Sequence, residues 1–496
     1  MKFKVKDVDI ATGDTKIALV NEIDAAKMDV HSGDRIVVRR GKRSAVAVVN
    51  IGESSKVVKP GIIGLFEEVL DALNAENNDN VDVKLGKKPE SLDFIRKKLD
   101  GRELNASEIK EIVKDIVSDS LTYIELTSYV VANYARGMSR REILDLTKAM
   151  VDTGVKINPH RRPVADLHSI GGIPGNRITM VVVPIVAAAG VVFPKTSSRA
   201  ITSPSGTADT MEVLAPVVAG KKRLAKILKD VGAFMVWGGA INLAPADDKI
   251  IKVEHPLQID AEGQMLASII AKKASVGSTH LLLELPIGKH AKLKTRKDAN
   301  HLKNQFEFLC KKLNIKLEIV FARGELPIGR GIGPVLEARD VLWVLQNDEC
   351  GPKDLRNKSI DYSGKLLELV GKAKKGKGNA MAKKLLDSGA AYRKMIEIIQ
   401  AQGGKVVAPG QLKPARFSHD VRAGSSGRVS KISIHHIARM ARMAGSPRDA
   451  GAGVYIHKMM GEKVKKGDLL YTVYAEGINS LKDALRECNG SCIIIN

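Results

Sequence analysis

Aromatic side chains are scarce in this sequence: Phe, Trp and Tyr make up 4% of its 496 residues. Proteins that bind single-stranded nucleic acid stack the bases on such rings, so the shortage argues against a base-stacking surface. Cysteine is also rare, with four residues that are too few and too scattered for a disulfide framework. Cys488 and Cys492 have a spacing known from metal sites, but no second pair accompanies them in the sequence, and we expect no metal.

Long apolar runs are missing as well. No stretch approaches the ~18 apolar residues that a membrane span needs. The first residues carry charges at nearly every second position instead of the apolar core of a signal peptide. We therefore expect a cytoplasmic protein without membrane contact.

Acidic residues are outnumbered: 79 Lys and Arg face 56 Asp and Glu, for a net charge of +23. Such a balance favours an anionic partner, which could be nucleic acid, anionic lipid or a phosphorylated small molecule. The cations are spread along the chain, with local concentrations at 289–297 and 372–384. This spread favours a solvated basic surface that also attracts phosphorylated substrates.

The length predicts several domains, and the residue patterns predict a multidomain α/β and α+β fold. Alternating and β-branched runs between turn residues predict strands at 2–10, 16–20, 34–38, 44–49 and 81–85, with a helix at 62–72. Helical periodicity follows, with cap signals at 105–108 and at Ser139 and Glu142. The expected domains are an N-terminal β-rich domain (1–85), a helical lobe (86–160), an α/β lobe with a mixed sheet (161–410) and a C-terminal α+β domain (411–496).

Two loops rich in glycine and hydroxyl groups are the most informative part of the chain. The first, at 166–177, contains His168-Ser169-Ile170-Gly171-Gly172, and the second, at 196–212, contains Ser197-Ser198-Arg199 and Ser203-Pro204-Ser205-Gly206-Thr207. Hydroxyls, free backbone N–H groups and a guanidinium hold phosphate oxygens well in such loops. The structural alternatives are a tight strand-to-helix turn and a capped loop. We expect two phosphate groups, on one ligand or on two.

A third glycine-rich segment, Gly329-Arg330-Gly331-Ile332-Gly333, superficially resembles a dinucleotide fingerprint. It lacks the third glycine at the right spacing and a convincing strand–helix–strand frame. We expect a bend at the start of a helix over 335–345 instead.

The two loops, together with the segments 242–247 and Ser268-x3-Lys272-Lys273, resemble the thymidine/pyrimidine-nucleoside phosphorylase family, which is related to anthranilate phosphoribosyltransferase. The resemblance covers roughly residues 90–480. Pyrimidine phosphorylases have Lys where this chain has Leu167, His-Thr-Gly in place of Ser203-Pro204-Ser205, and an Arg that is absent from Val253-Glu254-His255. These departures and the extra N-terminal domain resemble the archaeal AMP phosphorylase branch of the family.

The resemblance implies a reaction and its participants. Nucleoside 5′-monophosphates, AMP and as further candidates CMP and UMP, would react with inorganic phosphate to give free base and ribose 1,5-bisphosphate, without cofactor or metal. Asp260 would protonate the departing base, with an N-cap as its structural alternative. The implied substrate-binding residues are Ser169, Gly171, Gly172, Thr179, Ser197, Ser198, Arg199, Ala200, Ile201, Thr202, Ser203, Thr207, Ser268, Lys272 and Lys292.

Several of these residues also have a plain structural interpretation. Ser268 and Lys272, one helical turn apart, could belong to a solvated face, and Lys292 could belong to a solvated loop. His168 is expected to be a structural imidazole rather than a catalytic base. The resemblance further implies a homodimer through the helical lobe, and the N-terminal domain could join dimers into larger particles.

Three other functions remain open on the sequence. A pyrimidine-nucleoside phosphorylase is disfavoured by the missing Arg at 253–255 and by the N-terminal domain. A phosphoribosyltransferase would use a pyrophosphate and acidic magnesium ligands, for which no paired-acid motif is evident. A basic nucleic-acid-binding protein is the alternative of a different class.

Overall fold

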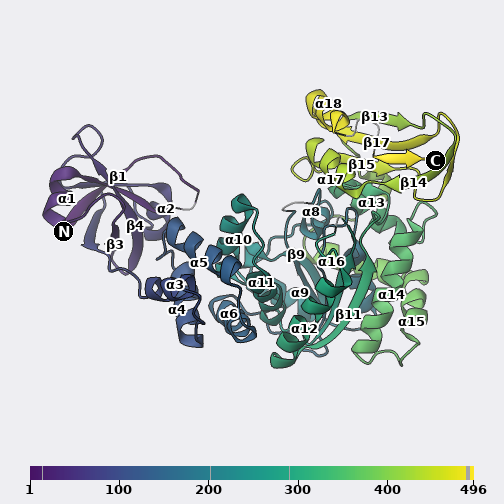
Figure 1. Ribbon diagram of the computed structural model, residues 1–496, viewed down its shortest axis with the longest axis horizontal. Helices are drawn as coiled ribbons and strands as arrows, with labels where there is room; N and C mark the ends of the chain where they lie inside the picture. The colour runs from purple at the N-terminus through teal and green to yellow at the C-terminus, as the bar shows by residue number, and fades with distance from the viewer. Residues whose placement is uncertain (14, 201–202, 290, 488–491) are drawn as a thin grey trace. The chain divides into compact units, whose positions relative to one another are not determined.

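The computed structural model describes residues 1–13, 15–200, 203–289, 291–487 and 492–496 (Figure 1). They form two compact units, one made of residues 1–149 and 246–265, the other of 150–245 and 266–496. Within these described ranges, no helix combines the length and the apolar character that a membrane crossing requires.

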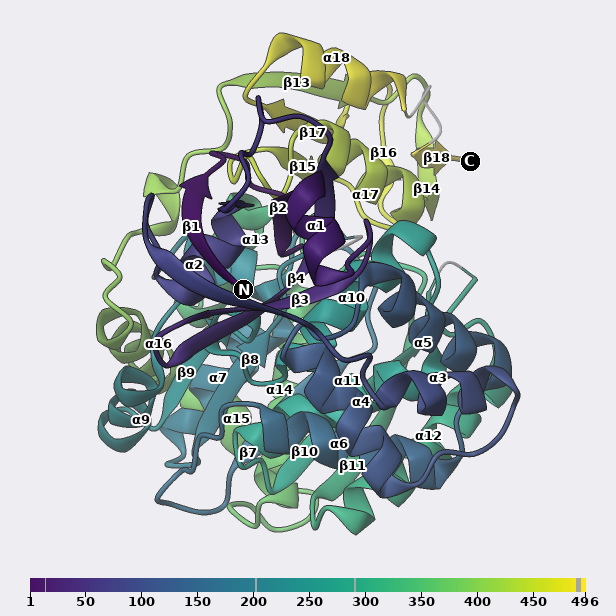
Figure 2. The same ribbon diagram turned by 90° about the vertical axis from the view of Figure 1, so that its left-hand side faces the viewer.

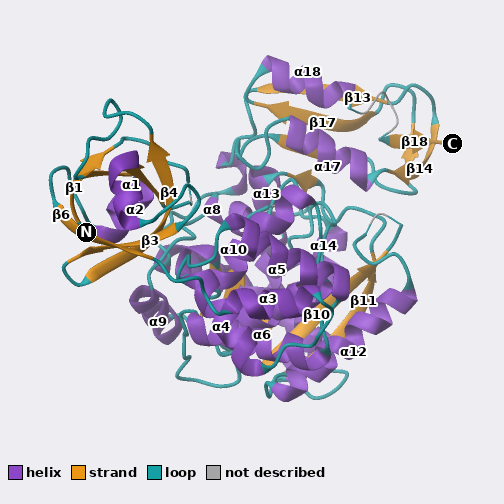
Figure 3. Cartoon of the chain, turned by 60° about the vertical axis from the view of Figure 1, so that its left-hand side comes forward, coloured by secondary structure: helices purple, strands orange, loops and turns teal. Residues whose placement is uncertain are grey.

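The N-terminal part of the first unit is a closed barrel with strand order β1-β5-β2-β4-β3-β6 (Figure 3). Burial alternates along its strands, as at Ala45, Ala47 and Val49, which point into the barrel core while their neighbours do not. The elements are β1 (Lys2–Asp7), β2 (Ile17–Asn21), α1 (Glu22–Met28), β3 (Arg35–Arg40), β4 (Arg43–Gly52), β5 (Ile62–Leu65), α2 (Glu67–Leu73) and β6 (Asn80–Leu85).

The prediction of a helix over 62–72 is wrong for its first residues. Ile62–Leu65 is a strand that pairs with β1 and β2, and the helix begins only at Glu67. Closing the barrel requires this short apolar segment as a strand, and tertiary pairing overrides the local helical pattern.

The first unit continues with helices whose starts follow the predicted cap signals. Asn105 and Glu108 form a capping box, and the Ser139 N–H donates to Glu142 at 2.8 Å. Ion pairs Lys16–Asp119 and Arg35–Glu125 join the barrel to these helices. The helices are α3 (Ser91–Leu99), α4 (Ala106–Val117), α5 (Tyr123–Arg136), α6 (Arg140–Thr153) and most of α10 (Pro245–Leu257).

The second unit contains an α/β domain built on parallel strands. The described pairs are β11-β10-β7 and β8-β9, and a parallel bridge between Val164 and Val192 links β7 to β8. Its strands are β7 (Ala165–Ser169), β8 (Phe193–Ser197), β9 (Ala233–Trp237), β10 (His280–Ile287) and β11 (Lys316–Arg323). Its helices are α7 (Ile178–Ala188), α8 (Thr207–Glu212), α9 (Lys221–Asp230), η1 (Gly239–Ile241), α11 (Glu262–Ser275, which begins in the first unit), α12 (Arg296–Lys312), α13 (Pro334–Leu345), α14 (Lys353–Leu369), α15 (Gly378–Asp387), α16 (Ala390–Ala401) and η2 (Pro409–Gln411).

This strand order places both glycine-rich loops at one edge of the sheet. Parallel strands end at the same edge, where α/β proteins bind their ligands. The first loop follows β7 and the second follows β8. The helix α7 connects the first loop to the strand that precedes the second loop. Its residues Ile178 to Ala187 are all buried, so this connection is part of the rigid core.

The C-terminal domain belongs to the same unit and combines two small antiparallel sheets with two helices (Figure 2). One strand, Gly331–Ile332, comes from the third glycine-rich segment and pairs with Val454 and Tyr455. Gly333 follows at a φ of +125°, where only glycine fits because a Cβ would lie 2.4 Å from the Ala452 carbonyl oxygen. The elements are β12 (Gly331–Ile332), β13 (Phe417–Arg422), β14 (Gly427–Ile432), α17 (Ile434–Met443), β15 (Gly453–Ile456), β16 (Lys463–Val464), β17 (Leu469–Ala475), α18 (Ile478–Arg486) and β18 (Ile493–Ile495). The predicted fold class is confirmed.

Candidate active site

The first loop offers unused hydrogen-bond donors. The hydroxyl of Ser169 is buried and has no hydrogen-bond partner among the described residues. Gly172 has a φ of +103°, and a Cβ built on it would meet no atom within 4 Å, so the backbone there borders open space. Buried polar groups without a partner are rare in proteins. A bound phosphate would satisfy this hydroxyl and the neighbouring N–H groups.

A buried cluster of one carboxylate and two lysines lies next to the first loop. Asp166 on β7 lies 3.0 Å from the ammonium of Lys273 and 3.5 Å from that of Lys195, and all three side chains are almost fully buried. The Lys195 ammonium also donates to the carbonyl oxygen of Leu167 at 2.5 Å. Burial and the charge of Lys273 lower the pKa of Lys195 to about 7.

Sequence reasoning missed Lys195. The available signal was a lysine within the otherwise apolar and hydroxyl-bearing strand Phe193–Ser197, where a charge needs a buried partner.

His168 lies among lysines. Burial lowers its pKa well below the ordinary value, and the charges of Lys273, Lys195, Lys272 and Lys292 lower it further. The imidazole is therefore neutral at physiological pH. The same electrostatic influence places Lys272 and Lys292, both predicted to bind substrate, in the neighbourhood of the first loop.

Two further predicted residues lie on helices of this unit. Ser268 and Lys272 share one face of α11, with the Lys272 ammonium 3.5 Å from the Ser268 hydroxyl. Thr179 lies in the first turn of α7, directly after the first loop, and its side chain is buried.

The second loop is held by Asp209, the third residue of α8. Its carboxylate accepts from the N–H groups of Ala200 at 2.7 Å and Gly206 at 2.8 Å. Arg199 pairs with Asp209 and with both oxygens of Glu212, and its guanidinium lies over the Trp237 ring. The charge of Arg199 is therefore already compensated by two carboxylates. Its visible role is to hold the loop in shape.

Close packing explains the glycine at 206. A Cβ there would lie 2.7 Å from the Ser198 carbonyl oxygen, so the loop folds onto its own backbone. Ser197 ends β8, Ser198 follows it, and the Ser203 hydroxyl donates to the Ser205 carbonyl oxygen at 3.0 Å. Ile201 and Thr202, both predicted to bind substrate, lie outside the described residues.

A single carboxylate connects the two loops. Glu337 on α13 pairs with Arg177, the last residue of the first loop, and accepts from the Thr210 hydroxyl of α8 at 2.8 Å. Arg177 also donates to the Thr207 hydroxyl at 3.1 Å and to the Ser205 carbonyl oxygen at 2.7 Å. The two loops therefore form one hydrogen-bonded assembly.

The predicted general acid belongs to the other compact unit. Asp260 lies between α10 and α11, two residues before Glu262 begins α11.

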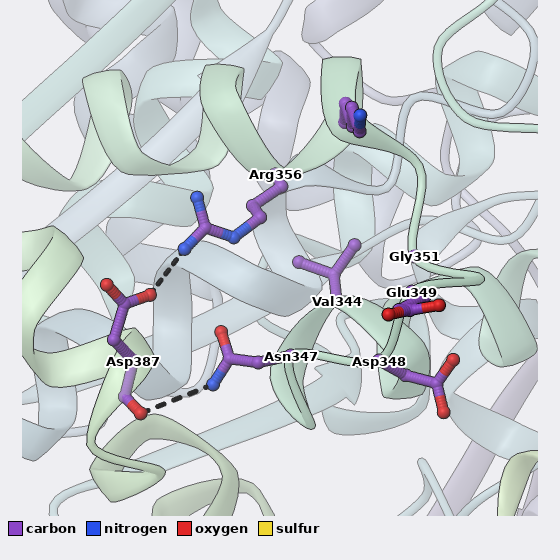
Figure 4. Close-up of a pocket in the computed structure, with 8 residues that line it drawn as sticks. Val344, Asn347, Asp348, Glu349, Gly351, Arg356 and Asp387 are labelled. Atoms are coloured by element: carbon purple, nitrogen blue, oxygen red, sulfur yellow. Dashed lines mark hydrogen bonds and ion pairs between the residues drawn. The ribbon is translucent and has the colours of Figure 1, made fainter.

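One cavity opens directly onto the loops. It has a volume of about 400 Å³ and is lined by Gly172 of the first loop, Ser203 and Pro204 of the second, and one face of α17. A second cavity of about 330 Å³ lies at the end of α13 (Figure 4). That second cavity is lined by the carboxylates of Asp348, Glu349 and Asp387 and by the cations of Lys353 and Arg356, so it has no excess of positive charge for an anion.

Metal chemistry has no visible site here. In the part of the chain that the structure describes, His, Cys, Asp and Glu do not come together in a group of three or more that could hold a metal ion.

Three family models match separate segments of the chain. Residues 92–154 match the model of the glycosyl transferase family helical bundle domain, 161–279 that of the glycosyl transferase family a/b domain, and 428–494 that of the pyrimidine nucleoside phosphorylase C-terminal domain. AMP phosphorylase 1 from Archaeoglobus fulgidus is 43% identical over 490 residues, which cover 99% of this chain and 96% of the relative. The chain belongs to the AMP phosphorylase family.

Other relatives agree with this assignment. AMP phosphorylase from Methanococcoides burtonii is 41% identical over 98% of this chain and 95% of its own length. Matches of this extent include the N-terminal barrel, which is thus a common part of AMP phosphorylases and no isolated addition. The family resemblance inferred from the loops is confirmed.

A solved structure shows the same core fold. Anthranilate phosphoribosyltransferase from Thermus thermophilus superposes with a TM-score of 0.54 at 19% identity, covering 62% of this chain and 98% of that chain. At this identity the likeness concerns the fold alone.

Proposed function

We propose that this protein cleaves nucleoside 5′-monophosphates, with AMP as the principal substrate, by transfer of the ribose 5-phosphate to inorganic phosphate. The observation that carries the proposal is the end-to-end similarity to AMP phosphorylases in a chain whose first loop holds a buried, unpartnered hydroxyl. Phosphate is the co-substrate, and the proposed reaction uses no cofactor or metal.

The proposed reaction is a substitution at the anomeric carbon. An oxygen of inorganic phosphate forms a bond to C1′ while the bond between C1′ and the base nitrogen breaks. The bonding electrons leave with the base, which takes a proton from Asp260. Free base and ribose 1,5-bisphosphate result, and the 5′-phosphate is unchanged.

The residues divide into two roles. Ser169 and the N–H groups of Gly171 and Gly172 would hold inorganic phosphate, with the lysines around His168 supplying positive charge. Residues of the second loop and of α11 would hold the nucleotide. They are Ser197, Ser198, Arg199, Ala200, Ile201, Thr202, Ser203, Thr207, Ser268 and Lys272.

Incubation with a panel of substrates tests the proposal. AMP, CMP, UMP, adenosine and thymidine would each be incubated with and without phosphate, and free base and ribose 1,5-bisphosphate measured. We expect base release from a 5′-monophosphate only when phosphate is present. Equal use of adenosine or thymidine would favour a nucleoside phosphorylase.

Nucleic-acid binding is tested separately. Filter binding of a polynucleotide across a salt series would reveal an affinity that falls steeply with salt if the basic surface serves that purpose.

For the assembly we propose a cytoplasmic homodimer formed through the helical lobe. An apolar stripe on α5 supports it: Ile124 is 80% exposed, Val131 37% and Tyr134 53%, and their spacing places them along one side of the helix. Exposed apolar stripes of this kind mark contact surfaces. The barrel is proposed to join such dimers into larger particles.

A further inference from the structure

Helix α17 of the C-terminal domain has two opposite faces. Ile434, Ile437, Met440 and Ala441 are buried, mostly in the core of that domain. His435 lies three and four residues before Ala438 and Arg439, and Arg442 lies four and three residues after them, so the four residues share the other face. That second face lines the cavity of about 400 Å³ that opens onto Gly172, Ser203 and Pro204.

The charge on this cavity has one sign. Arg439 and Arg442 supply that charge, and no carboxylate is found among the cavity's described lining residues. Arg439 also forms an ion pair with Glu487, with its Nε 3.0 Å from the carboxylate. That pairing holds the guanidinium in place at the edge of the cavity.

The cations of the two loops are already engaged elsewhere. Arg199 is compensated by Asp209 and Glu212. The lysines Lys195 and Lys273 are buried against Asp166 on the side of the first loop. A phosphate monoester beside Ser203 would face the arginines of α17 on the opposite wall of the cavity.

We propose that this cavity binds the 5′-phosphate of the nucleotide, and that Arg439 and Arg442 of α17 provide its charge while the Ser203 hydroxyl contacts it from the loop. The inference rests on the proposed function and deepens it, because it makes the C-terminal domain the part that distinguishes a nucleotide from a nucleoside. Guanidinium groups suit this task because they bind phosphate oxygens in pairs.

Arg439→Ala and Arg442→Ala test the proposal, with Lys482→Ala as the matched control. Lys482 is an exposed cation of α18 in the same domain and does not line the cavity. AMP and adenosine binding would be measured by titration calorimetry, and kcat/KM for AMP and KM for inorganic phosphate by base release. A thermal unfolding curve of each variant checks folding.

The expected result is selective. Each arginine variant should lose roughly tenfold to hundredfold in AMP affinity and in kcat/KM for AMP, the range for a charge-assisted hydrogen bond. Adenosine binding and KM for phosphate should stay within about twofold of wild type. Lys482→Ala should resemble wild type throughout.

Other outcomes overturn the proposal. Equal losses for AMP and adenosine would make α17 a merely structural wall, and a raised KM for phosphate alone would assign the cavity to the co-substrate. Unchanged AMP affinity in both variants would remove α17 from substrate binding while leaving the proposed function intact. Wild-type protein that binds AMP through these arginines without cleaving it would instead overturn the proposed function and keep the subsite.

Discussion

The ammonium of Lys195 donates to the carbonyl oxygen of Leu167, at the position where pyrimidine phosphorylases carry a lysine of their own. In this chain the cation comes from the neighbouring strand and lies beneath the loop, paired with Asp166. A nitrogen donor is thus retained near the first loop although the side chain at 167 is apolar and buried.

Lys195→Met should change how stability depends on pH. Burial lowers the pKa of Lys195 from 10.5 to about 7, so between these values the unfolded chain holds a proton that the folded chain lacks. Stability therefore rises with pH across this window. Thermal unfolding at pH 7, 8, 9 and 10 should show a smaller rise for Lys195→Met than for wild type. The exposed Lys222→Met is the control, and identical slopes in all three proteins would contradict the assignment.

Asp260→Asn should lower kcat strongly and leave AMP affinity nearly unchanged. Asparagine has the same shape but cannot give a proton to the base, and a positioned general acid contributes about 10²–10⁴-fold. Single-turnover base release and AMP calorimetry measure the two quantities. The exposed Asp152→Asn serves as control, and a normal rate in Asp260→Asn would remove this residue from the chemistry.

Ile124→Asp should reduce the mass of the particle, because it disrupts the contact proposed between helical lobes and leaves the proposed barrel contact intact. A carboxylate at the N-terminal end of the α5 stripe would have to be desolvated on association, which costs several kcal/mol or prevents contact. Light scattering after size-exclusion chromatography gives the mass. Val406→Asp, at another exposed apolar residue, should keep the wild-type mass. A wild-type mass in Ile124→Asp would place the contact elsewhere.

Deletion of residues 1–85 should leave a smaller but catalytically active particle. The barrel has a core of its own, and its closed strand order leaves no free sheet edge, so any contact it makes uses side-chain surfaces. The same chromatography compares particle size, and base release from AMP reports on the active site. If the truncated chain keeps the full-length mass but loses activity, the barrel acts at the active site instead of in assembly.

The regular elements of the fold were largely predictable because their signals are local. The capping boxes at Asn105 and Ser139 marked helix starts, and the alternation around Val46 marked a barrel strand. Ile62–Leu65 defeated this reasoning, because four apolar residues fit either structure and only barrel closure decides. The complete burial of α7 likewise depends on the core that other segments of the chain build around it.

For the candidate site, the sequence identified the two loops but not the buried residues that hold the loops in place. Hydroxyls and glycines at Ser169 and Gly172 stand out in the chain itself. Lys195 and Glu337 act through partners far away in sequence. The lysine in the strand Phe193–Ser197 signals that a buried partner exists, but the sequence does not identify that partner. The same holds for α17, whose basic face becomes informative once the fold places it opposite Ser203.

The shared carboxylate of Glu337 is a physical link between the two loops that are proposed to bind phosphate and nucleotide. It bonds Arg177 of one loop and Thr210 of the helix after the other, so a shift in either loop changes the hydrogen bonds of both. If phosphate in the first loop orders the hydrogen bonds of Glu337, the second loop is already in its binding conformation when the nucleotide arrives. The nucleotide then binds more tightly. By reciprocity the nucleotide must then strengthen phosphate binding by the same factor. The enzyme would fill its two sites cooperatively and seldom hold one reactant alone.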